Sequence, residues 1–275
     1  MKIALLGAGG KMGCRIADNL LHDGTNEIAA VEVSAAGRAN VQERGLEAVS
    51  PEQAVPGAGA VILAVPDRLI RTIARDAVPL MDPGSMLIAL DPAAPYAGAL
   101  PERPDVTYFC THPCHPPLFG VETRPEARAD WFGGTARQHI VCALAQGPET
   151  DYAAGERLAR TIYAPVIDSF RVTVEQMAIL EPTLVETFTA TLISAMKEGL
   201  DTVVEMGVPR DAAEAFLFGH LRTEFGIIFG FSGFPFSDGA QLAVDKAGPR
   251  IFRDDWKQIF TLESLRRSVT EIVGD

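Results

Sequence analysis

The chain has 275 residues, 47% hydrophobic and 22% charged, the ordinary composition of a globular protein with one or two domains. Its 36 acidic and 24 basic side chains give a net charge of −12, which argues against a partner such as nucleic acid or an anionic membrane surface. No apolar run is long enough to span a bilayer, and the first residues are not those of a signal peptide. We therefore expect a cytoplasmic protein whose four cysteines stay reduced.

Short apolar runs alternate with helical patterns in the first half of the chain. Four strand-like runs cover residues 2–7, 27–33, 59–65 and 85–90. Three more, at residues 106–110, 139–145 and 165–170, would extend the same sheet. Continuously apolar strands between helices are typical of a parallel sheet covered on both faces. The pattern predicts a doubly wound α/β fold.

A glycine-rich loop, "GAGGKMG", follows the first predicted strand and precedes a helix. Gly7 allows a tight turn, and Gly9 and Gly10 let the backbone approach a pyrophosphate. Gly13 lets the helix and the strand pack closely. The helix N-terminus offers N–H donors and a positive dipole end to a phosphate. The loop predicts a dinucleotide site; the alternative is a glycine-rich turn without a ligand.

Acidic residues follow two later strands at the same edge of the sheet. Glu32, 19 residues beyond Gly13, would accept hydrogen bonds from a ribose 2′-hydroxyl and repel a 2′-phosphate, which favours NAD over NADP. The alternative is a solvated carboxylate, and Arg38 nearby argues mildly for NADP. Asp67 follows the third strand, where it either lines the cofactor site or caps the next helix.

The segment "YFCTHPCHPPLFG" carries His112 and His115 between prolines that stiffen the backbone. A histidine on a stiff loop at the carboxyl edge of the sheet suits general base catalysis or metal ligation. The alternatives are two structural histidines and a zinc knuckle, although the Cys/His spacing is unusual for zinc. We expect the cysteines to be small buried apolar residues.

Residues 173–206 form a helical pattern, and Pro182 within it predicts a kink. Glu181 lies among apolar residues directly before this proline, so its side chain is either buried for a metal or catalytic role or turned outward. On an ideal α-helix Glu175 and Glu186 share a face. Only a kink at Pro182 would bring Glu181 and Glu186 together.

The change of pattern near residue 171 predicts two domains. Residues 1–171 would form a Rossmann domain that binds NAD, and residues 172–275 an all-helical domain for substrate binding and dimerisation. Apolar surface in the helical domain favours a homodimer, and the alternatives are an intrachain core or a lid. The phenylalanines that would supply this surface are Phe225, Phe229, Phe231, Phe234 and Phe236.

Four segments carry a resemblance to a known family: "GAGGKMG", "THPCHPPLF", "VCALAQGPE" and "EQMAILEP". Together they resemble the 6-phosphogluconate dehydrogenase-like superfamily and, within it, the D-apionate oxidoisomerase family, over essentially the whole chain. The resemblance implies a 6-phosphogluconate dehydrogenase-like C-terminal domain and a role in bacterial pentose catabolism. It also implies NAD-dependent oxidation of a secondary alcohol of D-apionate, followed by a ketol rearrangement that gives 3-oxo-isoapionate.

Two neighbouring families fit less well. Dihydrodipicolinate reductase has a very similar glycine loop, but its His-His/Lys catalytic segment is absent from this chain. β-Hydroxyacid dehydrogenases carry a catalytic lysine early in the first long helix of the second domain. The comparable segment here, "LEPTLVE", has glutamates and no lysine, which favours a metal.

A ketol shift needs an alkoxide and a carbonyl held together, which a divalent cation such as Mg²⁺ or Zn²⁺ can do. We therefore expect His115 and Glu181 to be metal ligands, His112 to be the catalytic acid/base and Glu186 to support it. The predicted cofactor-binding residues are Gly7, Gly9, Gly10, Lys11, Met12, Gly13, Glu32 and Asp67. The alternative functions are an NAD-dependent hydroxyacid dehydrogenase without rearrangement, and a non-catalytic NAD sensor, which would not need the His/Glu cluster.

Overall fold

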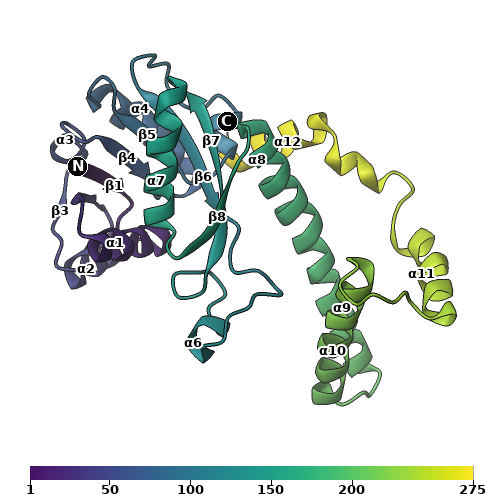
Figure 1. Cartoon of the computed structure of the whole chain (residues 1–275). Helices are drawn as coiled ribbons and strands as arrows, with labels where there is room; N and C mark the ends of the chain where they lie inside the picture. The colour runs from purple at the N-terminus through teal and green to yellow at the C-terminus, as the bar shows by residue number, and fades with distance from the viewer. Residues whose placement is uncertain (275) are drawn as a thin grey trace. The chain divides into compact units, whose positions relative to one another are not determined.

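The computed structural model describes residues 1–274. Its centre is an eight-stranded sheet with strand order β3-β2-β1-β4-β5-β6-β7-β8 (Figure 1). The strands are β1 (Lys2–Leu6), β2 (Glu27–Val31), β3 (Ala48–Val49), β4 (Ala60–Leu63), β5 (Met86–Ala89), β6 (Thr107–Pro113), β7 (Gln138–Gln146) and β8 (Val166–Arg171). The seven predicted strands are all present, whereas the two-residue β3 is too short to leave an apolar run in the sequence.

The sheet is parallel except at one pair, since β7 runs antiparallel to β6. Helical crossovers are needed only between parallel strands. The segment between β6 and β7 instead forms a long loop with one short helix, α6 (Pro125–Arg128). The expectation of a wholly parallel sheet was therefore wrong at this pair.

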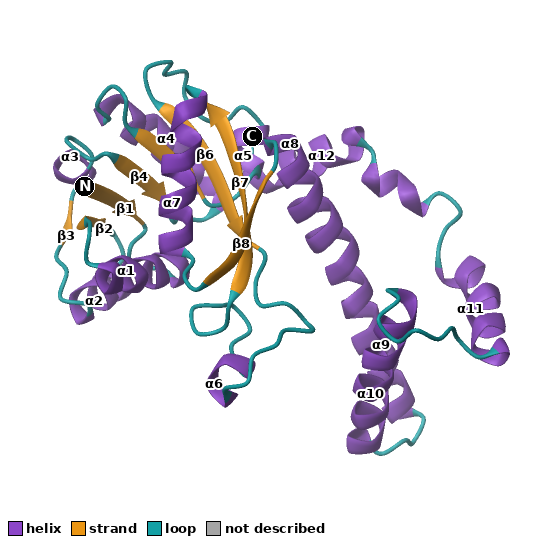
Figure 2. Cartoon of the chain, in the orientation of Figure 1, coloured by secondary structure: helices purple, strands orange, loops and turns teal. Residues whose placement is uncertain are grey.

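Helices and short helical turns cover both faces of the sheet and continue into the second half of the chain (Figure 2). Before β8 these are α1 (Lys11–Asp23), α2 (Ala35–Glu43), α3 (Pro51–Ala54), α4 (Asp67–Ala77), η1 (Val78–Leu80), α5 (Ala93–Tyr96), η2 (Glu149–Asp151) and α7 (Tyr152–Ile162). After β8 they are α8 (Val174–Ala178), η3 (Ile179–Ala190), α9 (Thr191–Glu205), α10 (Arg210–Ile228), α11 (Asp238–Ile251), η4 (Trp256–Phe260) and α12 (Leu262–Val273). Within residues 1–274, none of the helices has the length and apolarity needed to cross a membrane.

The two faces of the sheet bury separate hydrophobic cores. Ile3 and Leu5 of β1 point to the core that also holds residues of α1 and α7. Ala4 and Leu6 point to the other core, which holds residues of α4, α5 and α12. This alternation with a period of two is what a strand buried on both faces requires.

The chain divides into two compact units. The first comprises Met1–Pro182 and the C-terminal segment from Leu265, and the second comprises Thr183–Ser264. Leu265, Val269 and Val273 of α12 are buried in a core of the first unit. The predicted domains, residues 1–171 and 172–275, differ from these packing units and stay a prediction.

The helix around Pro182 is not interrupted. Instead of a break, the backbone forms a π-helix, η3, with Pro182 inside it. A proline lacks the N–H of an α-helical bond and clashes with the carbonyl four residues earlier, and i→i+5 turns accommodate both defects. The angles predicted for Glu175, Glu181 and Glu186 assumed α-helical turns, so they do not apply across this segment.

Candidate active site

The glycine loop lies at the carboxyl ends of β1, β2 and β4. Gly7 has φ of +81°, and a Cβ added there would lie 2.3 Å from the Ala64 carbonyl oxygen. The Gly7 and Ala8 amides donate to the Val31 carbonyl at 2.9 and 3.1 Å. Position 7 therefore requires glycine, because the turn is tight and both neighbouring strands press against it.

The other glycines of the loop differ in what surrounds them. A Cβ on Gly9 would lie 2.1 Å from the Gly37 carbonyl oxygen, and one on Gly13 would lie 2.0 Å from that of Gly7. A Cβ on Gly10 would meet nothing closer than 3.4 Å. Close packing thus explains Gly9 and Gly13, whereas Gly10 is exposed at the start of α1, which has no side-chain cap. This arrangement fits a dinucleotide pyrophosphate, which would approach the backbone there.

Glu32, just after β2, is held by several hydrogen-bond donors. Its carboxylate accepts bonds from the backbone amides of Gly9, Val33 and Ser34 at 2.9–3.0 Å and from the Ser34 hydroxyl. Burial alone would raise the pKa of Glu32, but these hydrogen bonds outweigh it and lower the pKa. An ionised carboxylate at this position suits a ribose diol and opposes a 2′-phosphate.

The structure weakens the argument that Arg38 favours NADP over NAD. Its Nε donates to the Glu32 carbonyl at 3.1 Å, so the side chain is committed in part to the backbone.

Carboxylates and a histidine gather at the ends of β4, β5 and β6. Asp67 is the first residue of α4. Burial makes the largest contribution to raising the pKa of Asp67, and the negative charge of Asp91 raises it further. The charge of His112 acts in the opposite direction on the same carboxyl. The N-cap of α4 is Pro66, without a side-chain cap bond, so the capping role expected for Asp67 is not seen, and its place in the cofactor site stays a prediction.

Both predicted catalytic histidines bond a backbone carbonyl through Nδ1. His112 belongs to β6 itself rather than to the following loop, and its Nδ1 lies 2.8 Å from the Leu90 carbonyl oxygen. His115 Nδ1 lies 3.1 Å from the Phe132 carbonyl oxygen. A carbonyl only accepts, so Nδ1 carries the proton in each neutral ring and the lone pair is at Nε2. The ring centroids are 6.3 Å apart, so the structure brings these two histidines together.

Phe132, in the loop between β6 and β7, contacts the cofactor loop and the helix that follows it. Sequence analysis did not predict a role for Phe132. The Phe132 carbonyl accepts a hydrogen bond from Arg15 of α1 at 2.5 Å, and Lys11 Nζ lies 3.2 Å from the Phe132 ring centroid. Asp130 accepts four backbone hydrogen bonds within the same loop. The only sign of this loop conformation in the sequence is the pair of glycines that follows Phe132. The structure gives both glycines a positive φ.

The predicted metal ligands and supporting glutamate stay predictions. Glu181 lies in the first unit with His115, and its charge contributes, after burial, Asp91 and Cys142, to the raised pKa of the buried Cys110 thiol. Glu186 belongs to the second unit. Within residues 1–274 no group of three or more His, Cys, Asp or Glu side chains is arranged to hold a metal. An ion at His115 and Glu181 would therefore need further ligands from substrate or water.

The structure pairs none of Cys14, Cys110, Cys114 and Cys142 with another cysteine. Cys110 and Cys142 are buried as predicted, whereas Cys114 is exposed and Cys14 is half-buried. The prediction of burial was wrong for Cys114, because it directly precedes His115 where the chain leaves the sheet.

Known proteins match the chain along its whole length. Residues 1–90 match the family "Acetohydroxy acid isomeroreductase, NADPH-binding domain", and residues 120–273 match "Phosphogluconate dehydrogenase (decarboxylating) C-term". A curated relative from Cupriavidus necator, named D-apionate oxidoisomerase, is 50% identical over 98% of this chain and 99% of its own. One with the same name from Rhizobium rhizogenes is 49% identical over 98% of both.

Two solved structures share the fold closely. One is described as a semialdehyde dehydrogenase NAD-binding protein from Cupriavidus necator in complex with calcium and NAD. It has 49% identity and a TM-score of 0.96, and the match covers 98% of this chain and 99% of that one. The other, a putative oxidoreductase from Jannaschia sp. CCS1, has 41% identity and a TM-score of 0.92 over 99% and 98% of the two chains.

The fold, the glycine loop and these matches define an NAD-dependent oxidoreductase with an N-terminal Rossmann domain and a 6-phosphogluconate dehydrogenase-like helical region. Within that class, identity of 37–50% to four curated relatives over nearly the full chain is decisive. The chain belongs to the D-apionate oxidoisomerase family.

Proposed function

We propose that this protein oxidises D-apionate with NAD and rearranges the product to 3-oxo-isoapionate. The observation that carries the proposal is the pair of histidines, His112 and His115, at the sheet edge that also holds the glycine loop and Glu32. An NAD sensor would need the loop and the glutamate but not the histidines. When bound, NAD supplies the hydride acceptor for the alcohol.

We propose that His112 moves the proton of the reacting hydroxyl. Its Nδ1 proton is held by the Leu90 carbonyl, so Nε2 can take up the hydroxyl proton when the alcohol becomes a carbonyl. The rigid position of His112 within β6 fixes where that proton goes. The predicted support of this step by Glu186, a residue of the second unit, stays a prediction.

We propose that His115 and Glu181 bind a divalent cation. An imidazole nitrogen suits Zn²⁺ and a carboxylate oxygen suits Mg²⁺, and the similar structure from Cupriavidus necator is described with calcium. When bound, such an ion supplies polarisation of a carbonyl during the ketol shift. The hydrogen bond of His115 to Phe132 orients the ring for this role.

The test is NADH formation by the purified protein with D-apionate and a panel of other sugar acids, with and without EDTA. The carbon skeleton of the product is then determined by NMR. NADH formation that EDTA abolishes, with a migrated hydroxymethyl group, would support the proposal. Oxidation that resists EDTA and leaves the skeleton intact would favour the alternative, a plain hydroxyacid dehydrogenase.

Histidine variants assign the roles. His112→Ala should lower turnover by about 10²–10⁴-fold, the usual contribution of a general acid/base. His115→Ala should abolish metal-dependent turnover while NAD affinity, measured by calorimetry, stays unchanged. His22→Ala, on the exposed end of α1, is the matched control. Unchanged turnover in His115→Ala would refute its assignment as a ligand.

We further propose that the protein acts as a homodimer in the bacterial cytoplasm. The free cysteines are consistent with a reducing compartment. Exposed aromatic side chains in the second unit, Phe216, Phe229 and Phe234 among them, offer apolar surface for a second copy.

A further inference from the structure

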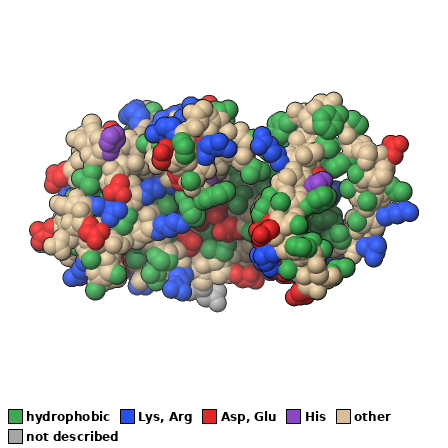
Figure 3. Space-filling model, turned by 90° about the horizontal axis from the view of Figure 1, so that it is seen from below, with side chains coloured by type: hydrophobic (Ala, Val, Ile, Leu, Met, Phe, Trp, Pro, Cys, Tyr) green, Lys and Arg blue, Asp and Glu red, His purple; other side chains and the backbone are tan. Residues whose placement is uncertain are grey.

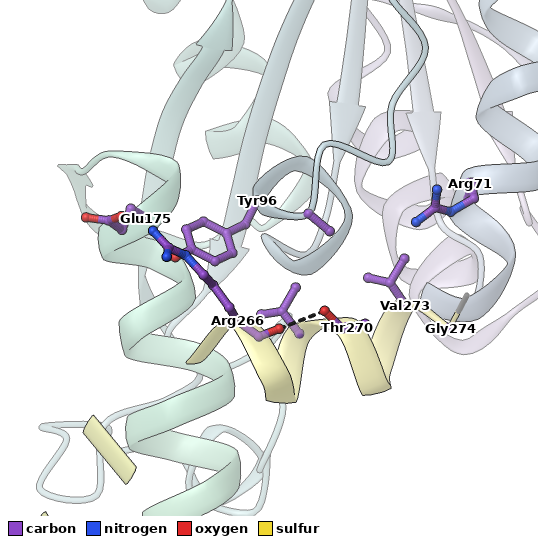
Figure 4. Close-up of a pocket in the computed structure, with 9 residues that line it drawn as sticks. Arg71, Tyr96, Glu175, Arg266, Thr270, Val273 and Gly274 are labelled. Carbon is purple, nitrogen blue, oxygen red and sulfur yellow. Dashed lines mark hydrogen bonds between the residues drawn. The ribbon is translucent and has the colours of Figure 1, made fainter. Parts of the chain in front are cut away.

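A pocket of about 470 Å³ lies within the first unit, apart from the candidate active site described above. Its walls come from α4, α5, α8 and α12 (Figure 4). None of the residues proposed above for cofactor, metal or catalysis lines it. Its size is in the range of pockets that bind small organic ligands.

Two arginines give the pocket a cationic character. Arg71 comes from α4 and Arg266 from α12, and both are exposed. Neither guanidinium has an ion-pair partner among the residues that the structure describes. In a chain with a net charge of −12, two arginines at one pocket without such partners favour an anionic ligand.

A tyrosine hydroxyl in the same pocket lacks a hydrogen-bond partner. Tyr96 lines the wall, and its Oη is buried without a donor or acceptor from residues 1–274. Buried hydroxyls are rarely left unpaired, because water no longer compensates for the missing bond. A ligand oxygen in the pocket would supply the partner.

The remaining lining limits what the ligand can be. Glu175 also belongs to the lining, but its carboxylate points away from Tyr96 and Arg266 (Figure 4), so the two arginines set the charge that a ligand would meet. Val269 and Val273 add an apolar wall against which a short carbon chain can pack. The lining therefore suits a ligand with an anionic group, a hydroxyl group and a short carbon chain.

We propose that this pocket binds a small hydroxylated organic anion, a sugar acid or a sugar phosphate, separately from the catalytic site. The carboxylate or phosphate would pair with Arg71 or Arg266. A hydroxyl group of the ligand would bond Tyr96 Oη. This proposal does not depend on the identity of the substrate.

The test is calorimetric titration of the full chain, saturated with NAD, with three probes: D-gluconate, ribose 5-phosphate and inorganic phosphate. We expect one of the first two to bind more tightly than inorganic phosphate. Tyr96→Phe, which removes only the hydroxyl, should weaken that binding about tenfold, and Arg266→Ala by at least as much. Arg75→Ala, an exposed arginine of α4 outside the pocket, should leave it unchanged.

Three outcomes would overturn the proposal: no binding of any probe, equal binding by Tyr96→Phe and the unaltered protein, or binding that His112→Ala abolishes. The last would place the probe in the catalytic site. Preference for gluconate or for ribose 5-phosphate tells a sugar acid from a sugar phosphate. Thermal melting of Tyr96→Phe shows that the variant is folded, so a loss of affinity reports on the pocket.

Discussion

At the scale of single residues, the neighbouring glycines Gly9 and Gly10 of the cofactor loop are packed differently. Gly9 packs against the first turn of α2 at Gly37, whereas Gly10 is exposed and a Cβ there would make only ordinary van der Waals contacts. The fingerprint spacing predicted both as cofactor-binding residues. Their surroundings separate a position that the fold itself requires from one that only a ligand would require.

Gly9→Ala should destabilise the folded protein, whereas Gly10→Ala should not. The added methyl at position 9 would overlap the Gly37 backbone, and the shift needed to relieve it costs about 1–3 kcal/mol. Urea unfolding of both variants measures the difference. Equal stability of the two variants would contradict the packing seen at Gly9.

The second prediction at this scale concerns Asp67. Burial and Asp91 raise its pKa in the folded state, so the ionised carboxylate destabilises the fold once the pH is above that pKa. Asp67→Asn should therefore raise the Tm at pH 7, by about 2 °C since the side chain is only half-buried. The gain should shrink as the pH falls toward the ordinary aspartate pKa, where the native carboxyl is protonated.

Thermal melts of this variant from pH 7 downward test the sign. Asp76→Asn, on the exposed side of the same helix, is the control and should leave the Tm unchanged at every pH. A lower Tm for Asp67→Asn at pH 7 would mean that the ionised carboxylate stabilises the fold.

Local periodicity predicted most elements, but not those shaped by distant contacts. Seven of the eight strands follow from their apolar runs, and four of these, β1, β4, β5 and β6, are buried almost throughout, whereas the edge strand β8 is largely exposed. The antiparallel β7 and the π-helix at Pro182 did not follow, because strand direction and helix type depend on hydrogen bonds that side-chain patterns do not encode. The helical pattern of α12 was clear, yet its return to the first unit was not.

Leu265→Ala should show how much α12 contributes to the first unit. Leu265 is 2% exposed and belongs to the core of α4 and α5, so truncation should cost about 2–5 kcal/mol. Arg267→Ala, on the exposed side of the same helix, should cost little. Chemical unfolding of both variants measures this, and a stable Leu265→Ala would mean that α12 packs elsewhere.

At the scale of the whole molecule, the family relationship identifies the function more specifically than the geometry of the site does. The motifs predicted the Rossmann region and the oxidoisomerase family, which the full-length relatives confirm. The candidate site was predictable where the sequence places residues at strand ends, as for Glu32 and His112. It was not predictable at Phe132, whose role arises only from contacts with Arg15 and His115.

The composition of the second unit leads to the last prediction. Leu200 and Ala213 are the only buried apolar residues in 183–264, whereas Phe216, Phe229 and Phe234 are all more than half exposed. Phe229 also stacks on Phe225 with ring centroids 5.5 Å apart, which presents an aromatic ridge. Figure 3 shows hydrophobic side chains at the surface among charged ones on one face of the molecule. Such surface is costly in water unless a second copy covers it.

Light scattering on a size-exclusion column should therefore give about twice the chain mass of 29.5 kDa. Phe229→Glu should shift the protein toward the monomer, because a charge would lie in the apolar contact, and its Tm should depend less on protein concentration than the Tm of the unaltered dimer. Leu21→Glu places the same charge on an exposed position of α1 and should stay dimeric. A mass of one chain for the unaltered protein, at concentrations well above those used for activity, would show that the aromatic ridge is covered in some other way.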